Sequence, residues 1–250
     1  MTIEPRPRIP ISADWVLKRI QEGKNVRLKN AIIEGDLDLN KLDLPTQHIE
    51  RTEELKQMSL KEDVIVVKSS IKIINSEIQG NLDFSNATFS GYAGFNGATF
   101  SGDAGFKGAT FSGYAWFDGA TFSGDAGFNG ATFSEDAGFG GAKFEGDVLE
   151  FKNSIFIDAK SQENACRRAK NVLEKNGDRE EAGYHFYREM EGKRKQKESD
   201  YGYFDYEALL FCKETVAIPK ELTDLFKYLR YNVLEGVGLA PDFSPSEMNF

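Results

Sequence analysis

The sequence predicts a β-solenoid with helical segments at both ends, and three observations support that prediction. Between residues 86 and 140 an 11-residue unit recurs five times, as in G-A-T-F-S-G-D-A-G-F-K at 97–107. Phenylalanines recur with gaps that alternate between six and five residues, and the 55 residues of the repeats hold 13 glycines. No proline lies between 46 and 218, so every backbone amide of the repeats can donate a hydrogen bond.

The glycines exclude both a helix and a collagen-like rod. An 11-residue apolar period also fits a right-handed coiled coil, but the glycines would cost a helix about 13 kcal/mol relative to alanine. Glycine does not occupy every third position, as collagen requires. What remains is a series of short extended segments that turn at Gly or a small polar residue. Such segments bury their apolar sides only by stacking as a solenoid.

A tandem Ala-x-Phe-x-Gly motif shows which family this segment resembles. It occurs at Ala87–Gly91, Ala98–Gly102, Ala109–Gly113 and Ala120–Gly124, and Ala131–Glu135 departs from it only at the last residue. The chain is similar to the pentapeptide-repeat proteins. The resemblance implies a right-handed, four-sided β-helix in which the Phe and the small residue two places before it point inward. Every second unit here has six residues, so we expect a coil of about 22 residues, longer than four pentapeptides.

The phenylalanines form the predicted core, a packed aromatic ladder without room for a substrate. Leu and Ile replace Phe with similar spacing at 26–39 and 71–84, so we expect the solenoid to start before the clean repeats. At the other end the repetition becomes irregular, because one extra residue precedes Phe151. The expected ladder consists of Phe84, Phe89, Phe95, Phe100, Phe106, Phe111, Phe117, Phe122, Phe128, Phe133, Phe139 and Phe144.

Corner residues supply the candidate interaction surface. The residue that opens each six-residue unit is Tyr or Asp, and like residues recur at a spacing of 22. A 22-residue coil therefore stacks the tyrosines on one face and the aspartates on the opposite face. The carboxylates either bind a cation or point into water, and the aromatic rings either anchor a partner or stack along a column. The candidate residues are Asp103, Asp125, Asp147, Tyr92, Tyr114 and Trp116.

The flanking segments read as helices and one insertion. Near the N-terminus, Trp15, Val16 and Ile20 mark the apolar stripe of a short helix that begins after Ser12. From Ala159 onwards the apolar spacing is again helical. The expected divisions are an N-terminal capping helix in 1–25, a first coil in 26–44, an insertion in 45–68, the main β-helix in 69–158, and a helical region with a loose tail in 159–250.

The C-terminal region predicts a helical hairpin and a third helix. In the second helix of the hairpin, Ala182, Phe186, Tyr187 and Met190 are expected to face inward. The third helix is expected at Pro219–Leu234, followed by a loose tail. Helices over both ends of the solenoid favour a monomer. In related pentapeptide-repeat proteins a similar region can lead into a membrane module.

The charge distribution points to a protein partner. The chain carries −9, and −7 of this belongs to residues 69–158, which hold eleven acidic and four basic side chains. Such a surface keeps a repeat protein dispersed, and it repels nucleic acid phosphates. The family resemblance adds an alternative, because some pentapeptide-repeat proteins mimic DNA and bind DNA gyrase or topoisomerase IV.

No residue pattern predicts an enzyme, a cofactor or a metal site. The two histidines, His48 and His185, lie in separate segments, and no zinc, phosphate-loop or nucleophile-elbow motif is present. Two cysteines, Cys166 and Cys212, form no disulfide framework, and together with the absence of a long apolar run they predict a cytoplasmic location. The basic run 193–197 is either a solvated helix end or a contact with an anionic surface.

These observations predict a non-enzymatic rigid scaffold that contacts an unknown protein partner. One alternative is a DNA-mimicking inhibitor or protector of a type II topoisomerase. The other is a membrane-associated regulatory module that acts through the C-terminal helices.

Overall fold

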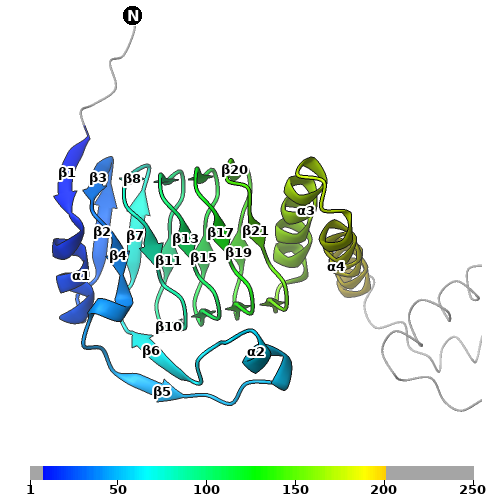
Figure 1. Cartoon of the computed structure of the whole chain (residues 1–250), viewed down its shortest axis with the longest axis horizontal. Coiled ribbons are helices and arrows are strands. Elements are labelled where there is room, and N and C mark those ends of the chain that lie inside the picture. Colours follow the sequence, from blue (N-terminus) through cyan, green and yellow to red (C-terminus); the bar gives the residue numbers. More distant parts are fainter. Residues whose placement is uncertain (1–7, 201–250) are drawn as a thin grey trace, which may run out of the picture. The chain divides into compact units, whose positions relative to one another are not determined.

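Short parallel strands stack coil upon coil in four sheets, with a helix at the N-terminal end and a helical hairpin at the C-terminal end (Figure 1). This computed structural model describes residues 8–200. The described residues up to Glu198 form one compact unit. The predicted helix Pro219–Leu234, the tail and Cys212 lie outside the described residues.

Each sheet collects strands from successive coils. Sheet A joins β1 (Ile9–Ser12), β3 (Ala31–Glu34), β8 (Glu77–Ile78), β12 (Thr99–Phe100), β16 (Thr121–Phe122) and β20 (Lys143–Phe144). Sheet B joins β2 (Val26–Lys29), β7 (Ile71–Ile74), β11 (Ala93–Gly94), β15 (Ala115–Trp116) and β19 (Ala137–Gly138). Sheet C joins β4 (Leu37–Asp38), β9 (Leu82–Asp83), β13 (Ala104–Gly105), β17 (Ala126–Gly127) and β21 (Leu149–Glu150). Sheet D joins β5 (Thr46–His48), β6 (Asp63–Val67), β10 (Ala87–Phe89), β14 (Thr110–Phe111), β18 (Thr132–Phe133) and β22 (Ile155–Phe156).

The pairing register confirms a β-solenoid built from regularly spaced parallel strands. Ala93 pairs with Ala115 and Ala115 with Ala137, so like residues of the repeat stack 22 positions apart. The register slips by one residue near the C-terminal end, where Ala126 pairs with Leu149. The slip follows from the extra residue that precedes Phe151, and it lies after the pair Phe122 and Phe144, which keeps the 22-residue spacing.

Glycine at one corner of each coil is required by the backbone. Gly97, Gly119 and Gly141 have φ between 63° and 67°, a left-handed conformation that costs residues with a Cβ about 1–2 kcal/mol. Asn75 occupies the same corner one coil before Gly97, at φ 49°, because Asn tolerates this conformation better than other side chains. The tight corner explains why the repeat keeps Gly or Asn at this position.

Helix α1 (Ala13–Gln21) covers the N-terminal end of the core. The Ser12 side chain caps the helix by accepting from the Asp14 amide at 3.2 Å. Val16, Leu17 and Ile20 are buried, together with Ala13. The prediction that Trp15 belongs to the apolar stripe is wrong, since its side chain is 43% exposed. Trp15 lies one turn before Arg19, on the outer side of the helix.

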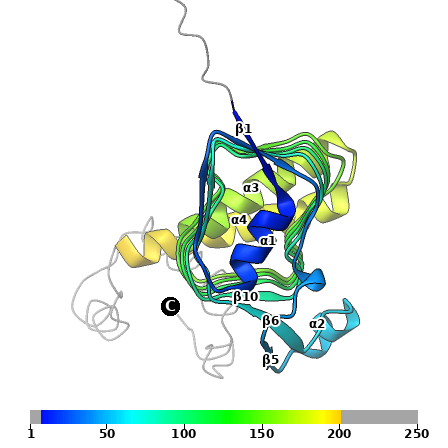
Figure 2. The same cartoon turned by 90° about the vertical axis from the view of Figure 1, so that its left-hand side faces the viewer.

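The predicted insertion at 45–68 is too long at its C-terminal end. β6 pairs with β10 in parallel, with Ile65 opposite Ala87, so 63–67 belong to the solenoid wall. The apolar run Val64–Val67 is what permits this, because Ile65 and Val67 are the register partners of the inward-facing Ala87 and Phe89 and pack in the solenoid core. The remainder of the insertion lies outside the coils (Figure 2). Its strand β5 pairs antiparallel with β6 at the edge of sheet D, and it also holds helix α2 (Glu53–Gln57).

The segment 49–62 runs along one corner of the solenoid, and we call it the strap. Arg51, which is almost fully buried, donates to the carbonyl oxygen of Gly108 at 2.9 Å. The Lys61 amide donates to the Asn86 side chain at 3.1 Å, and Leu60 lies against Gly108 and Gly130. The strap therefore binds to successive coils at equivalent positions.

Helices α3 (Ala159–Lys175) and α4 (Arg179–Asp200) form a hairpin at the C-terminal end, and α3 contacts β19, β21 and β22. The prediction that Phe186 and Tyr187 face inward is wrong, because they are 50% and 67% exposed. The buried face of α4 consists of small and polar residues instead. They are Ala182, His185, Glu189 and Gly192.

Candidate interaction surfaces

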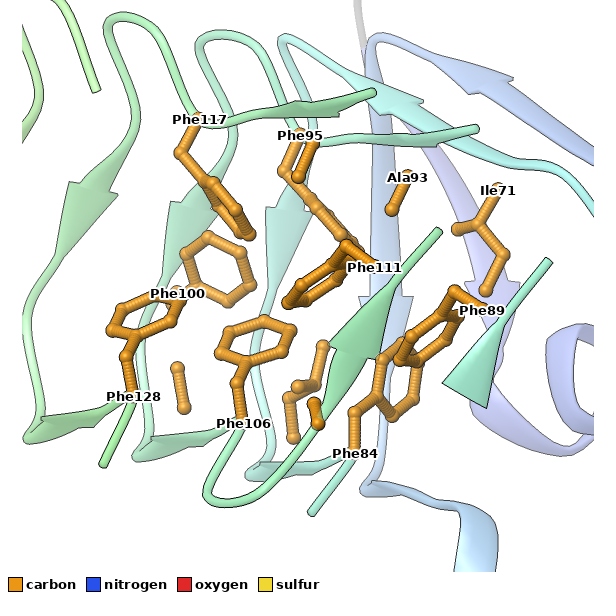
Figure 3. Close-up of a cluster of buried hydrophobic side chains, with 14 of the residues drawn as sticks. Ile71, Phe84, Phe89, Ala93, Phe95, Phe100, Phe106, Phe111, Phe117 and Phe128 are labelled. Carbon is orange, nitrogen blue, oxygen red and sulfur yellow. The ribbon is translucent and has the colours of Figure 1, made fainter. Parts of the chain in front are cut away.

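The solenoid interior is filled with aromatic rings and offers no space for a ligand (Figure 3). Eleven of the twelve phenylalanines between 84 and 144 are buried, and Phe144, in the last strand of sheet A, is partly exposed. Most rings one coil apart stack in parallel, as Phe100 and Phe122 do with 4.5 Å between centroids, although Phe84 and Phe106 meet edge to face at 6.1 Å. Rings of neighbouring columns meet edge to face, as Phe106 and Phe117 do at 5.3 Å. Any binding site must therefore lie on the outer surface.

The aspartate column at one corner acts as a backbone cap. Asp103 accepts from the Asp125 amide at 3.0 Å, and its own amide donates to the Asn81 side chain at 3.0 Å. Asp125 accepts in turn from the amide of Val148 at 3.0 Å. Each side chain thus binds the backbone of the next coil. A column of this kind needs an acceptor oxygen, which Asn81 supplies as well as an aspartate does, so charge is not what it requires.

Asp147 does not continue the aspartate column as predicted. The slip in register places Val148, rather than Asp147, opposite Asp125. The backbone carbonyl of Asp147 instead accepts from the Asn176 side chain at 2.6 Å. Among the described residues no cluster of acidic, histidine or cysteine side chains has the geometry to hold a metal ion.

Tyr92 and Tyr114 pack along their own strands. The Tyr92 ring lies over Gly94, where an added Cβ would overlap it, and the Lys72 ammonium sits 4.4 Å from the ring centroid. Tyr114 stacks on Trp116 with 6.1 Å between centroids and 18° between planes. The Trp116 ring in turn covers Gly138 of the next coil. The aromatic residues therefore form a layer on the outside of sheet B.

The repeats of the central coils match a known family. Residues 84–132 match the family described as pentapeptide repeats, in nine copies. The chain contains pentapeptide repeats. No curated protein matches it, and no solved structure does.

Sheet B also carries basic side chains that sequence reasoning missed. Arg27 of β2 and Lys72 of β7 are register partners. Both point outward, because Val26 and Ile71, which precede them in the strands, are buried. Neither Arg27 nor Lys72 forms an ion pair within the described residues. Their adjacency was hidden because 45 positions separate them, so that the coil spacing of the repeats does not relate them.

An open pocket of about 660 Å³ adjoins β2 at the N-terminal end of the solenoid. The Arg19 guanidinium lies 5.1 Å from the centroid of the Trp15 ring, and Arg19 donates to the carbonyl oxygen of Asn25 at 2.9 Å. Arg27 lines the same pocket. The spacing of Trp15 and Arg19, one helical turn apart, is the sequence signal that points to this contact.

The C-terminal hairpin buries charge around Glu189. Its carboxylate forms ion pairs with Lys170 at 3.0 Å, Lys193 at 2.7 Å and Arg167 at 3.3 Å. Burial alone would raise the pKa of Glu189, but the hydrogen bonds from Lys193 and Lys170 keep it below its ordinary value. In the basic run 193–197, Lys193 and Lys195 are paired with Glu189 and Glu191. These pairs favour the interpretation of the run as a solvated helix end.

Two buried groups of the hairpin are held in their neutral forms. Burial raises the pKa of the Cys166 thiol to about 11. Burial, helped by the nearby Arg188, lowers the pKa of His185 to about 4, and His185 Nδ1 has no hydrogen-bond partner. A neutral thiol is a poor nucleophile, and neither Cys166 nor His185 has a catalytic partner among the described residues.

Within residues 8–200 no helix is both long and apolar enough to cross a membrane.

Proposed function

We propose that the chain is a non-enzymatic scaffold whose outer surface binds another protein. The observation that carries this proposal is the filled interior, with eleven buried phenylalanines between 84 and 144, which leaves only the outside for recognition. A ladder of repeated coils gives an extended and stiff surface, as in other repeat proteins.

For the geometry of the fold, we propose a right-handed, four-sided β-helix of about 22 residues per coil. The four sheets and the 22-residue register support it.

The divisions that we propose follow these roles. Residues 1–25 cap the N-terminal end, 26–44 and 63–158 carry the coils, and 159–250 begins with the hairpin that covers the C-terminal end. The partner is unknown, and the proposed location is the cytoplasm, where a thiol such as Cys166 stays reduced. No cofactor enters the proposal.

A capture experiment with the full chain tests the scaffold. The immobilised protein is incubated with native cytoplasmic extract, and each retained protein is purified and titrated against the full chain by calorimetry. We expect at least one partner that binds saturably at micromolar concentration or below. If every retained protein fails to bind when purified, the scaffold proposal is wrong.

The acidity of the coils supports DNA mimicry as a second candidate. Residues 69–158 carry a net charge of −7, and Asp83 of β9 and Glu150 of β21 point outward from sheet C. A mimic inhibits DNA supercoiling by purified gyrase, and the double variant Asp83→Asn with Glu150→Gln inhibits less. Unchanged supercoiling at a large molar excess of the full chain would exclude this candidate.

A membrane role through the C-terminal helices is the third possibility. It has less support, because Lys193 and Lys195 are already engaged by Glu189 and Glu191. Sedimentation with vesicles rich in phosphatidylserine tests it, and failure of the full chain to sediment with them would exclude it.

A further inference from the structure

Sheet B differs from the rest of the solenoid in the charge of its outer side chains. Arg27 and Lys29 point outward from β2, and Lys72 stands beside Arg27 on β7. Sheet C presents Asp38, Asp83 and Glu150 at its corresponding positions. The first two coils of sheet B are therefore basic in an acidic protein, and Arg27, Lys29 and Lys72 form no ion pairs within residues 8–200. Further along the sheet, the Asp118 carboxylate lies beside Trp116, over Gly138.

Aromatic side chains continue this basic surface in both directions. Towards the C-terminal end lie Tyr92, next to Lys72, and then Tyr114 and Trp116. Towards the N-terminal end, Arg27 borders the pocket that contains Trp15 and Arg19. Trp15 and Trp116 are the two tryptophans of the whole chain, and each lies at one end of the surface. We call it the basic–aromatic face, formed by Trp15, Arg19, Arg27, Lys72, Tyr92 and Trp116.

We propose that the basic–aromatic face is the docking surface of the scaffold and that its partner is an acidic protein segment with aromatic side chains. This inference rests on the proposed scaffold function and specifies where and what it binds. Trp, Tyr and Arg are the residues most often found as energetic anchors in protein interfaces. Unpaired cations at one sheet supply charge complementarity to carboxylates, which favours association with acidic partners over basic ones.

The ring contacts favour a protein segment over single-stranded nucleic acid. Base stacking requires an open aromatic face, but the Tyr92 ring lies between Gly94 and the Lys72 ammonium. The Trp116 ring lies over Gly138 and is stacked with Tyr114. A long phosphate backbone would also extend beyond the basic sheet into the field of the acidic coils. A short acidic peptide meets only the local cations, because salt screens the more distant carboxylates.

The two tryptophans provide a direct test on the full chain. The probe is a peptide of repeated Glu-Glu-Phe units, titrated while tryptophan emission is recorded, with a Lys-Lys-Phe peptide and oligothymidine as comparison ligands. We expect the glutamate peptide to shift the emission saturably, and the variants Trp15→Phe and Trp116→Phe to remove one part of the signal each. Binding should weaken as the salt concentration rises.

Paired charge variants show whether the face is responsible. We expect Arg27→Ala with Lys72→Ala to weaken binding of the glutamate peptide at least about tenfold. The matched control, Lys107→Ala with Lys143→Ala, also removes two positive charges, but from outside sheet B, and should change affinity less than about twofold. Circular dichroism and melting temperature verify that each variant is folded.

Three results would overturn the inference. They are absence of binding by the glutamate peptide, equal loss of binding in the control variant, or tighter binding of oligothymidine, which would assign the face to nucleic acid. The scaffold proposal is judged separately, by the partner captured from extract. If that partner binds the Arg27 and Lys72 double variant as tightly as the original chain, the scaffold stands and the assignment of its surface is wrong.

Discussion

The repeated coils and the segments that flank them are stabilised by opposite means. In the coils, phenylalanine rings stack at 4.5 Å to 5.4 Å on identical rings one coil away, and the buried side chains are almost all apolar. In the α3–α4 hairpin, the buried face of α4 holds His185 and Glu189, and a network of ion pairs holds the two helices together. The repeats therefore supply rigidity without distinguishing one coil from another, whereas the flanking residues supply contacts that occur once.

This difference has a consequence for recognition. A partner that bound the repeated residues alone would fit several coils equally well. Only side chains that interrupt the repeat fix a single position, and on sheet B these are Lys72 and Trp116. The basic–aromatic face lies where the regular coils meet the irregular first coil.

The largest expected effect separates the middle of the ladder from its end. Phe106 is fully buried and meets rings on both neighbouring coils, so Phe106→Ala should lower the free energy of unfolding by about 3–5 kcal/mol. Phe144 is partly exposed at the last coil, and Phe144→Ala should cost about 1 kcal/mol, since less surface is lost. Urea unfolding followed by circular dichroism measures both. Equal losses would contradict a ladder whose strength depends on burial.

The second effect belongs to the hairpin alone. The pKa of His185 is lowered to about 4, so below its ordinary value of 6.5 the unfolded chain binds a proton that the folded chain does not. Stability is therefore complete above pH 6.5 and falls as the pH is lowered, by about 2 kcal/mol at pH 4.5. The variant His185→Gln should lose this pH dependence. Urea midpoints between pH 7 and 4.5 provide the measurement. If the variant lost stability with falling pH as steeply as the original chain, His185 would not be the cause of the pH dependence.

The third effect compares two corner glycines. Gly119 and Gly130 have nearly the same φ, 67° and 64°, so replacing either with Ala should cost about 1 kcal/mol in backbone strain. A Cβ at Gly130 would also lie 2.5 Å from Leu60 of the strap, whereas at Gly119 it has no neighbour within 3.8 Å. We expect Gly130→Ala to cost about 1 kcal/mol more. It should also speed tryptic cleavage within the strap, and equal cleavage in the two variants would show that the strap does not rest there.

The smallest effect tests the aspartate column. Asp103→Asn keeps the oxygen that accepts from the Asp125 amide, so its unfolding free energy should change by less than about 0.5 kcal/mol. Asp103→Ala removes that acceptor and should cost about 1 kcal/mol. Thermal melting of the two variants distinguishes a structural cap from a charge-dependent role. If Asp103→Asn lost more unfolding free energy than Asp103→Ala, the result would favour a charge-dependent role for the column.

The sequence predicted the solenoid because its strongest signal, the Phe spacing, is local and repeated. The same spacing led to an error at Asp147, since a period of 22 assumes that no residue is added. One extra residue before Leu149 moved Val148 into the column instead. Periodicity describes a coil correctly only until an insertion breaks it.

The errors in the helices have another physical cause. Apolar character suggested that Trp15, Phe186 and Tyr187 face inward, yet all three are exposed. In α4 the inward positions favour small side chains, because a Cβ at Gly192 would lie only 2.8 Å from the Ala159 carbonyl oxygen. To predict that Arg27 and Lys72 are neighbours, one must know how the strands pair across the insertion. No local pattern in the sequence contains that register.

The strap has a bearing on how such a gene can change. Tandem repeats are prone to gain or lose whole units when DNA is copied. A solenoid without a strap would tolerate a changed number of coils. Here the strap meets Asn86, Gly108 and Gly130 at fixed intervals, and Met58 contacts Asn153 beyond them. Deleting one coil would bring equivalent corner residues beneath the strap, but it would take Asn153 out of reach of Met58. The length of the strap therefore matches a defined number of coils.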